Sequence, residues 1–215
     1  MPTRDVASRI GRRASRAGVS VPAEAVLGLV AYLDLLTRWN KKINLTALVL
    51  DPLSDQAIDR LIVEPLVAAS RVRPADRLAV DIGSGGGSPA IPLRLAAPHL
   101  RMVLVDVKVR KCAFLREVVR QLGLGQVEVV TARYEELLTR ADLHGSVDLV
   151  SVRAVRAEEK LWTAAHGLLR PGGRVFWFTS EASSKTGLNW SFNIISSDKL
   201  DRSSEDRLVI AEAVR

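Results

Sequence analysis

The sequence predicts an α/β protein whose doubly wound parallel sheet carries helices on both faces. Three observations support this fold class. From about residue 75, apolar runs of strand length alternate with amphipathic segments, the first run ends in a glycine-rich turn at residues 83–87, and no earlier segment has the pattern of a buried strand. Strands that are apolar throughout are buried on both faces, and right-handed crossovers place helices on either side of them.

Helices are expected before the sheet. Residues 24–40, EAVLGLVAYLDLLTRWN, place apolar residues at helical intervals between Pro22 and Asn40. The first 20 residues hold five arginines and one acidic residue, Asp5, and their apolar positions keep a helical spacing, so we expect a basic surface helix rather than a transit peptide. Residues 53–70 predict a further helix, broken near Pro65 because proline donates no backbone hydrogen bond.

Five strand-and-helix units follow. We expect strands at 78–83, 102–107, 127–132, 147–152 and 174–178, with helices after Pro89 and over 109–123, 133–141 and 158–169. A Pro171-Gly172-Gly173 turn leads into the fifth strand. Two weaker candidates, 192–197 and 206–213, bring the total to seven strands, and the polar stretch 180–190 predicts a flexible surface loop. The expected division is therefore a helical segment, residues 1–72, and a cofactor-binding domain, residues 73–215.

Composition limits the class of protein and its partners. Lys plus Arg number 31 against 24 Asp plus Glu, which gives a formal net charge of +7 and favours polyanionic partners, although an Arg-rich composition alone is an alternative. No apolar run reaches the ~18 residues of a membrane span. A single cysteine, Cys112, favours a reducing, intracellular compartment.

The turn at residues 83–87 predicts a nucleotide-containing cofactor. Gly83 and Gly85 fit a dinucleotide fingerprint, but Ser88 stands where its third glycine belongs. Asp81 would repel a pyrophosphate and suits the ammonium of a methionine moiety, unless it only caps the turn through backbone bonds. Asp106, at the end of the second strand, can accept hydrogen bonds from ribose hydroxyls of either cofactor class.

The motifs also resemble a known family. VDIGSGGG, the strand-end Asp106, the Pro-Gly-Gly turn and the two terminal strands resemble the Rossmann-like, seven-stranded class I S-adenosylmethionine-dependent methyltransferases. WNKKINLTAL, DIGSGGGSPAIPL, VDVKVRKCAFLREVV, ARYEEL and VDLVSVRAV resemble, in order and spacing, the bacterial small-subunit (16S) ribosomal RNA guanine-N7 methyltransferases, the glucose-inhibited division B family. The resemblance implies a cytoplasmic monomer that binds S-adenosyl-L-methionine and 16S ribosomal RNA or the small ribosomal subunit, with no membrane or metal.

The resemblance assigns cofactor contacts residue by residue. It implies that the cofactor turn is formed by Gly83, Gly85 and Gly87, with Ser88 at the position after the turn. Asp81 would contact the amino-acid moiety and Asp106 the ribose. Tyr134 and Glu135 would border the adenine, and Arg153 would lie near the reacting methyl group.

Candidate RNA contacts are basic or lie in the W-N-x-x-x-N-L-T motif. They are Arg12, Arg13, Lys41, Lys42, Asn44, Lys108, Arg110 and Lys111. Phosphate contacts of this kind give affinity and salt dependence but little sequence choice, and each cation could equally be solvated charge. Trp39 is expected on the helix surface or in the core rather than as a stacking platform.

Several positions depart from the family's pattern. Gly86 stands where the family usually has Pro, and Ser88 where it has Leu or Phe. Asp59-Arg60 and Val63-Glu64 replace an Arg-His and a following Asp, and Phe178-Thr179-Ser180 replaces Leu-Lys-Gly. The change in the glycine turn concerns the cofactor pocket, and the other changes concern the contacts that would face RNA.

The chemistry of N7 of guanine agrees with the residues present. Its lone pair is free, so methyl transfer requires alignment but no general base, and no residue is assigned a catalytic proton transfer. Cys112 lies in an apolar helix, unlike the nucleophile of cytosine C5 transfer, and no Asp/Asn-Pro-Pro-aromatic turn or metal-ligand cluster is found. The alternatives are a non-catalytic or retargeted RNA-binding paralogue and a dinucleotide-dependent oxidoreductase.

Overall fold

The computed structural model describes residues 3–184, 191–200 and 206–214, and these form a seven-stranded sheet with the order β3-β2-β1-β4-β5-β7-β6. The strands are β1 (Leu78–Ile82), β2 (Arg101–Asp106), β3 (Val127–Thr131), β4 (Val147–Arg153), β5 (Leu169–Ser180), β6 (Phe192–Lys199) and β7 (Asp206–Ala213). The strands β1 to β5 pair in parallel and β7 runs antiparallel to both of its neighbours. The predicted seven-stranded α/β fold is confirmed, including the two weaker terminal strands.

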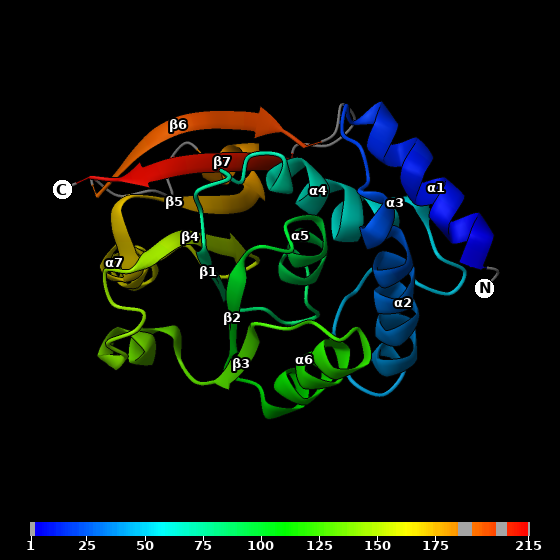
Figure 1. Ribbon diagram of the computed structural model, residues 1–215, viewed down its shortest axis with the longest axis horizontal. Helices are drawn as coiled ribbons and strands as arrows, with labels where there is room; N and C mark the ends of the chain where they lie inside the picture. The colour runs from blue at the N-terminus through cyan, green and yellow to red at the C-terminus, as the bar shows by residue number, and fades with distance from the viewer. Residues whose placement is uncertain (1–2, 185–190, 201–205, 215) are drawn as a thin grey trace.

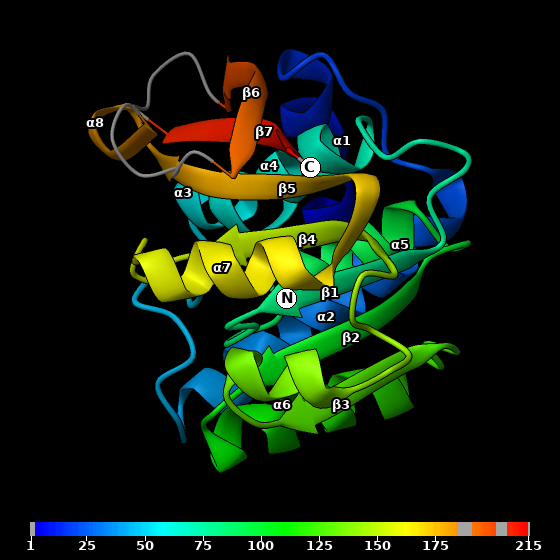
Figure 2. The same cartoon turned by 90° about the vertical axis from the view of Figure 1, so that its left-hand side faces the viewer.

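Helices cover both faces of this sheet (Figure 1). One face carries α1 (Thr3–Arg16), α2 (Ala23–Asn40), α3 (Asp55–Ile58), η1 (Asp59–Val63), α4 (Glu64–Ala69), α5 (Ala90–Ala96) and α6 (Val109–Gln121). The other carries η2 (Tyr134–Thr139) and α7 (Glu159–Leu168), and Figure 2 shows α7 in front of the sheet. No described helix combines the length and apolar character of a membrane span.

Alternation along the strands divides the core into two layers. On β1, Ala79 belongs to the layer under α2 and α6, while Val80 and Ile82 belong to the layer under α7. Ile10 and Leu29 of the N-terminal helices lie fully buried in the first layer together with strand residues. Residues before and after residue 72 thus share one hydrophobic core. The division of the chain into a helical segment and a cofactor-binding domain at residue 72 stays a prediction.

Four local details differ from the sequence predictions. The helix of residues 53–70 continues past Pro65 and contains a π-helical turn, η1, instead of a break. Residues 134–139 form a 3₁₀ helix rather than an α-helix. The Pro-Gly-Gly turn lies inside β5, where the pairing with β4 shifts between Val147 and Leu149. Part of the expected loop 180–190 is a short helix, α8 (Glu181–Ser184), and residues 185–190 lie outside the described residues.

Candidate functional site

The glycine turn follows β1 at the point where the strand order reverses. Gly83, Gly85 and Gly87 have φ values of +74°, +52° and +87°, a region that favours glycine. A Cβ on Gly83 would stand 2.4 Å from Cγ2 of Val155, and one on Gly87 would stand 2.9 Å from Cγ1 of Ile91. The turn therefore requires glycine for two reasons, its backbone conformation and its close packing.

Asp81 lies at the floor of this turn and is 1% exposed. Its Oδ1 accepts a hydrogen bond from Oγ of Ser151 at 2.5 Å, whereas Oδ2 is buried with no hydrogen-bond partner among the described residues. Burial raises the pKa of Asp81 to about 6, against the opposing effect of the Ser151 hydroxyl. A buried carboxylate with a free oxygen is costly unless a cation or a hydrogen-bond donor meets it, so Asp81 can accept either kind of group.

Asp106 fastens the turn to the end of β2. Its Oδ2 accepts the backbone N–H of Gly85 at 2.9 Å, and its Oδ1 accepts that of Lys108 at 2.8 Å. The Gly83 and Ser84 N–H groups both donate to the carbonyl of Val105. Each Asp106 oxygen has a second lone pair, so the carboxylate retains capacity for hydroxyl donors such as those of a ribose.

Tyr134 and Glu135 open the 3₁₀ helix η2 beyond β3. Tyr134 packs against the core layer under α7, and burial raises its pKa. Oε2 of Glu135 is buried and has no hydrogen-bond partner in the described part of the chain. The carboxyl ends of β1 and β3 thus each carry an acidic side chain with one unpaired oxygen.

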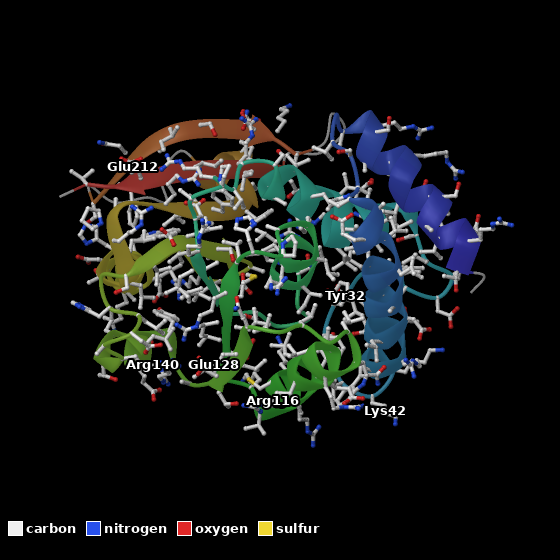
Figure 3. The ribbon with its side chains drawn as sticks, in the orientation of Figure 1. Tyr32, Lys42, Arg116, Glu128, Arg140 and Glu212 are labelled. Atoms are coloured by element: carbon white, nitrogen blue, oxygen red, sulfur yellow. The ribbon has the colours of Figure 1, made fainter. Side chains whose placement is uncertain are left out.

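The N-terminal segment holds the turn from the other side. The Tyr32 hydroxyl, on the side of α2 that faces α5 and α6, donates to the carbonyl of Gly86 at 2.7 Å (Figure 3). Asn40 closes the loop after α2, because its Oδ1 accepts the N–H groups of Leu45 and Thr46 at 2.9 and 3.0 Å. A Cβ on Gly86 would stand 3.2 Å from the Leu45 carbonyl oxygen, so this loop packs directly on the turn.

The π-helical turn η1 explains how Ser88 and Arg153 reach the helix before β1. In η1 the N–H of Glu64 donates to the carbonyl of Asp59, and Pro65 has no N–H to offer the next carbonyls. The carbonyl of Leu61 accepts a hydrogen bond from Oγ of Ser88 at 3.0 Å. The carbonyl of Arg60 accepts a hydrogen bond from Nη1 of Arg153. The predicted irregularity at Pro65 therefore builds part of the site.

Arg153 sits in the wall between the turn and a neighbouring cavity. Its Nη2 forms an ion pair with Glu64, its Nη1 also donates to Oγ of Ser88 at 3.2 Å, and its guanidinium carbon lies 4.2 Å from the Phe178 ring centroid. The cavity, of about 450 Å³, lies at the carboxyl ends of β4 and β5 and is within the size range of small-molecule sites. Its lining includes Arg60, Glu64, Arg153, Val155, Phe178, Thr179 and Ser180.

A match to a family model identifies the protein family of this chain. The family model described as GidB, rRNA small subunit methyltransferase G, matches residues 27–201. The chain belongs to this family. A relative from Stenotrophomonas maltophilia (strain K279a), named Ribosomal RNA small subunit methyltransferase G, is 38% identical over 160 residues, which cover 73% of this chain and 70% of that protein.

A relative of the same name from Mycobacterium leprae (strain TN) is 46% identical over 123 residues, which cover 57% of this chain. The chain spans about half the length of this first group of curated relatives, 49% and 48% for two Mycobacterium leprae strains. Among solved structures, cofactor-bound Rv0187 from MTB has a TM-score of 0.60 at 20% identity and covers 86% of this chain and 89% of its own. A SAM-dependent methyltransferase from Aquifex aeolicus has a TM-score of 0.55 at 14% identity, over 72% of this chain and 92% of its own. These two likenesses show the fold alone.

Three charged residues at positions that depart from the family's pattern, Asp59, Arg60 and Glu64, have ionic partners within the fold. Asp59 is bound by the guanidinium of Arg13, which also pairs with Asp55 at 2.7 Å. Arg60 pairs with Asp206, and Glu64 pairs with Arg153.

The candidate RNA contacts do not form one cluster. Arg12 and Arg13 lie on α1, and the Arg13 guanidinium is occupied by ion pairs. Lys42 and Asn44 are exposed after α2, while Lys41 pairs with Asp51 at 2.9 Å. Figure 3 places Lys42 at the end of α2 nearest α6.

The remaining three cations lie nearer to the glycine turn. Lys108 and Arg110 are exposed at the start of α6. Nζ of Lys111 stands 3.8 Å from the position a Gly85 Cβ would take. The neighbouring side chains of Val107 and Val109 are 53% and 69% exposed, so the segment after β2 presents both apolar and cationic groups to solvent.

Sequence reasoning missed two residues of the site. Ser151 is a polar residue in an otherwise apolar strand, and the β1–β4 register places it beside Asp81. That interruption was a signal for a buried hydrogen bond. Tyr32 gave no such signal, because an aromatic residue in an amphipathic helix is ordinarily a core residue.

Proposed function

We propose that this chain transfers a methyl group from S-adenosyl-L-methionine to N7 of a guanine in 16S ribosomal RNA. The observation that carries the proposal is the buried Asp81 carboxylate, whose Oδ2 has no hydrogen-bond partner among the described residues. A pyrophosphate beside that carboxylate would be repelled, so the feature favours a cofactor with an ammonium group over a dinucleotide. Membership of the GidB family supports the choice of ribosomal RNA.

The residues of the turn fit this cofactor. Asp81 would take the ammonium of its methionine part, Asp106 its ribose hydroxyls, and Tyr134 with Glu135 its adenine. When bound, S-adenosylmethionine supplies an electrophilic methyl group on a positively charged sulfur. The close-packed backbone of Gly83 and Gly87 would give it a preformed cradle, which lowers the entropic cost of binding.

The cavity at the ends of β4 and β5 is the proposed place of the acceptor base. Val155 connects it to the glycine turn, because its side chain packs against Gly83. N7 needs no proton removed, so the protein's contribution is orientation and exclusion of water, which can account for several kcal/mol of the barrier. The remaining proposals are a monomer, a cytoplasmic location, the RNA contacts on α1, on the loop after α2 and on α6, and the division at residue 72.

Methyl transfer from labelled S-adenosylmethionine to small ribosomal subunits that lack native base modifications tests the proposal. Borohydride and aniline treatment then cleaves the RNA at 7-methylguanosine. A single new cleavage site is the expected result. Cofactor binding without incorporation would replace the proposal by a non-catalytic or retargeted RNA-binding paralogue, and a purified protein with a strong near-ultraviolet or visible cofactor band would favour an oxidoreductase.

A further inference from the structure

Glu64 and Arg153 form an ion pair in the wall that the turn and the cavity share. The Glu64 side chain is 2% exposed and that of Arg153 is 12% exposed. Glu64 begins α4, directly after the π-helical turn, and Arg153 ends β4. A buried pair of this kind is held in one geometry, because separating it would leave the Arg153 guanidinium without its ionic partner in a poorly solvated place and Glu64 with only Arg60, whose Nε stands 4.0 Å from Oε1 of Glu64.

Arg153 has contacts on several sides. The Arg60 carbonyl and the Ser88 hydroxyl accept from its Nη1, and the Phe178 ring lies against its guanidinium. Ser88 directly follows the last glycine of the turn, so a shift of the guanidinium would also displace the end of the turn. The Glu64 carboxylate accepts a hydrogen bond from Nη2 of Arg153.

We propose that Glu64 is a positioning residue for methyl transfer, whose carboxylate holds the Arg153 guanidinium between turn and cavity and neutralises it there. This inference rests on the proposed function, and deepens it. Glu64 acts through Arg153 and does not exchange a proton with the substrate.

The movement of positive charge during methyl transfer explains why Arg153 needs a counter-charge. The carbon–sulfur bond breaks as the N7 lone pair forms the new carbon–nitrogen bond, the electron pair of the broken bond stays on sulfur, and the positive charge passes to the guanine ring. The cavity thus becomes more positive as the reaction proceeds. A guanidinium without a counter-charge in its wall would oppose that change, whereas a neutral ion pair does not.

The same geometry predicts a pH dependence. Burial raises the pKa of Glu64 to about 7, and the facing Arg153 and Arg60 oppose this rise, while Asp206 and Asp59 add to it. The carboxylate is therefore charged above about pH 7 and becomes neutral below it. Turnover at saturating cofactor should fall as the pH drops through that value.

The test compares Glu64→Gln and Glu64→Asp with the wild type. With Glu64→Gln we expect kcat to fall roughly ten- to hundredfold and the inflection near neutral pH to vanish, while Glu64→Asp, which keeps the charge, restores part of kcat and the inflection. Cofactor is kept saturating, because titration of Asp81 changes its affinity. Glu128→Gln is the matched control, since Glu128 on β3 pairs with Arg140 at 2.5 Å (Figure 3) and neither residue lines the cavity.

A second readout does not depend on activity. In cofactor-free protein labelled with ¹³C-glutamate, the carboxyl carbon signal that Glu64→Gln removes should titrate near pH 7. An unchanged kcat and pH profile in Glu64→Gln, or a signal that titrates as in an exposed glutamate, would overturn the role of Glu64. A wild type that transfers no methyl group would instead remove the proposed function itself, so the two failures are distinguishable.

Discussion

Asp81→Asn isolates the cost of one buried charge at the cofactor turn. Burial raises the pKa of Asp81 to about 6, whereas an aspartate in an unfolded chain titrates near about 3.9. Because the folded-state value is the higher one, the associated stability is fully present below about pH 4 and is lost as the pH rises through about 6. At neutral pH the cofactor-free protein therefore contains an unfavourable carboxylate.

The size of the effect follows from the two pKa values. A difference of about 2 units corresponds to about 3 kcal/mol of unfolding free energy. Asparagine removes this cost but places an amide N–H beside no acceptor, which costs about 1–2 kcal/mol. The net expectation is a variant more stable by about 1–2 kcal/mol near pH 8, or roughly 2–8 °C in Tm, with no gain near pH 4.

Denaturant unfolding of wild type and Asp81→Asn at several pH values measures this dependence directly. Asp148→Asn is the control, because its carboxylate accepts the N–H groups of Arg77 and Leu78 at 2.8 and 2.9 Å and its loss should destabilise the protein near pH 8. A stability difference between wild type and Asp81→Asn that does not grow with pH would refute the reasoning.

Ligand binding should respond in the opposite direction. The same Asp81→Asn variant, more stable without cofactor, should bind S-adenosylmethionine far more weakly while its affinity for RNA stays near that of the wild type. Binding to wild type should weaken as the pH falls through about 6, because a proton then competes for the carboxylate. Calorimetric titration at two pH values measures this, and equal losses of cofactor and RNA affinity would contradict the assignment of Asp81.

Three further expectations follow from the turn and the charge of the chain. Gly83→Ala should destabilise the protein by roughly 1–3 kcal/mol and abolish cofactor binding, because the new Cβ would meet Val155. The control variant Gly125→Ala, which has open space around the new Cβ, should unfold at nearly the same temperature as the wild type. Tyr32→Phe leaves the Gly86 carbonyl without its donor and should cost about 1–3 kcal/mol and weaken cofactor binding, which titration of a folded variant checks. RNA affinity should fall at least tenfold between about 50 and 200 mM salt in a filter-binding assay, while cofactor affinity changes little; equal salt slopes would contradict separate binding surfaces.

The sequence determined those parts of the fold that depend on residues close together along the chain. Apolar runs predicted the strands, and Asp81 with the glycines after it predicted a turn that binds a cofactor with an ammonium group. The interruption at Pro65 was also visible, but its form was not. Whether a proline breaks a helix or opens a π-helical turn depends on what can satisfy the freed carbonyls, and those partners, Ser88 and Arg153, come from other elements.

The pairings within the site had no local signal. Asp81 and Ser151 are separated by 70 residues, and Glu64 and Arg153 by 89. Only the order of the strands, with β1 beside β4, brings the first pair together. The second pair meets because α4 packs in the same core layer as β5 and β7. The sequence by itself determined which chemical groups the protein carries, namely a glycine turn, strand-end carboxylates and one strand-end arginine. The tertiary structure decided which of them remain unpaired, because burial and hydrogen-bond partners are properties of the packed chain.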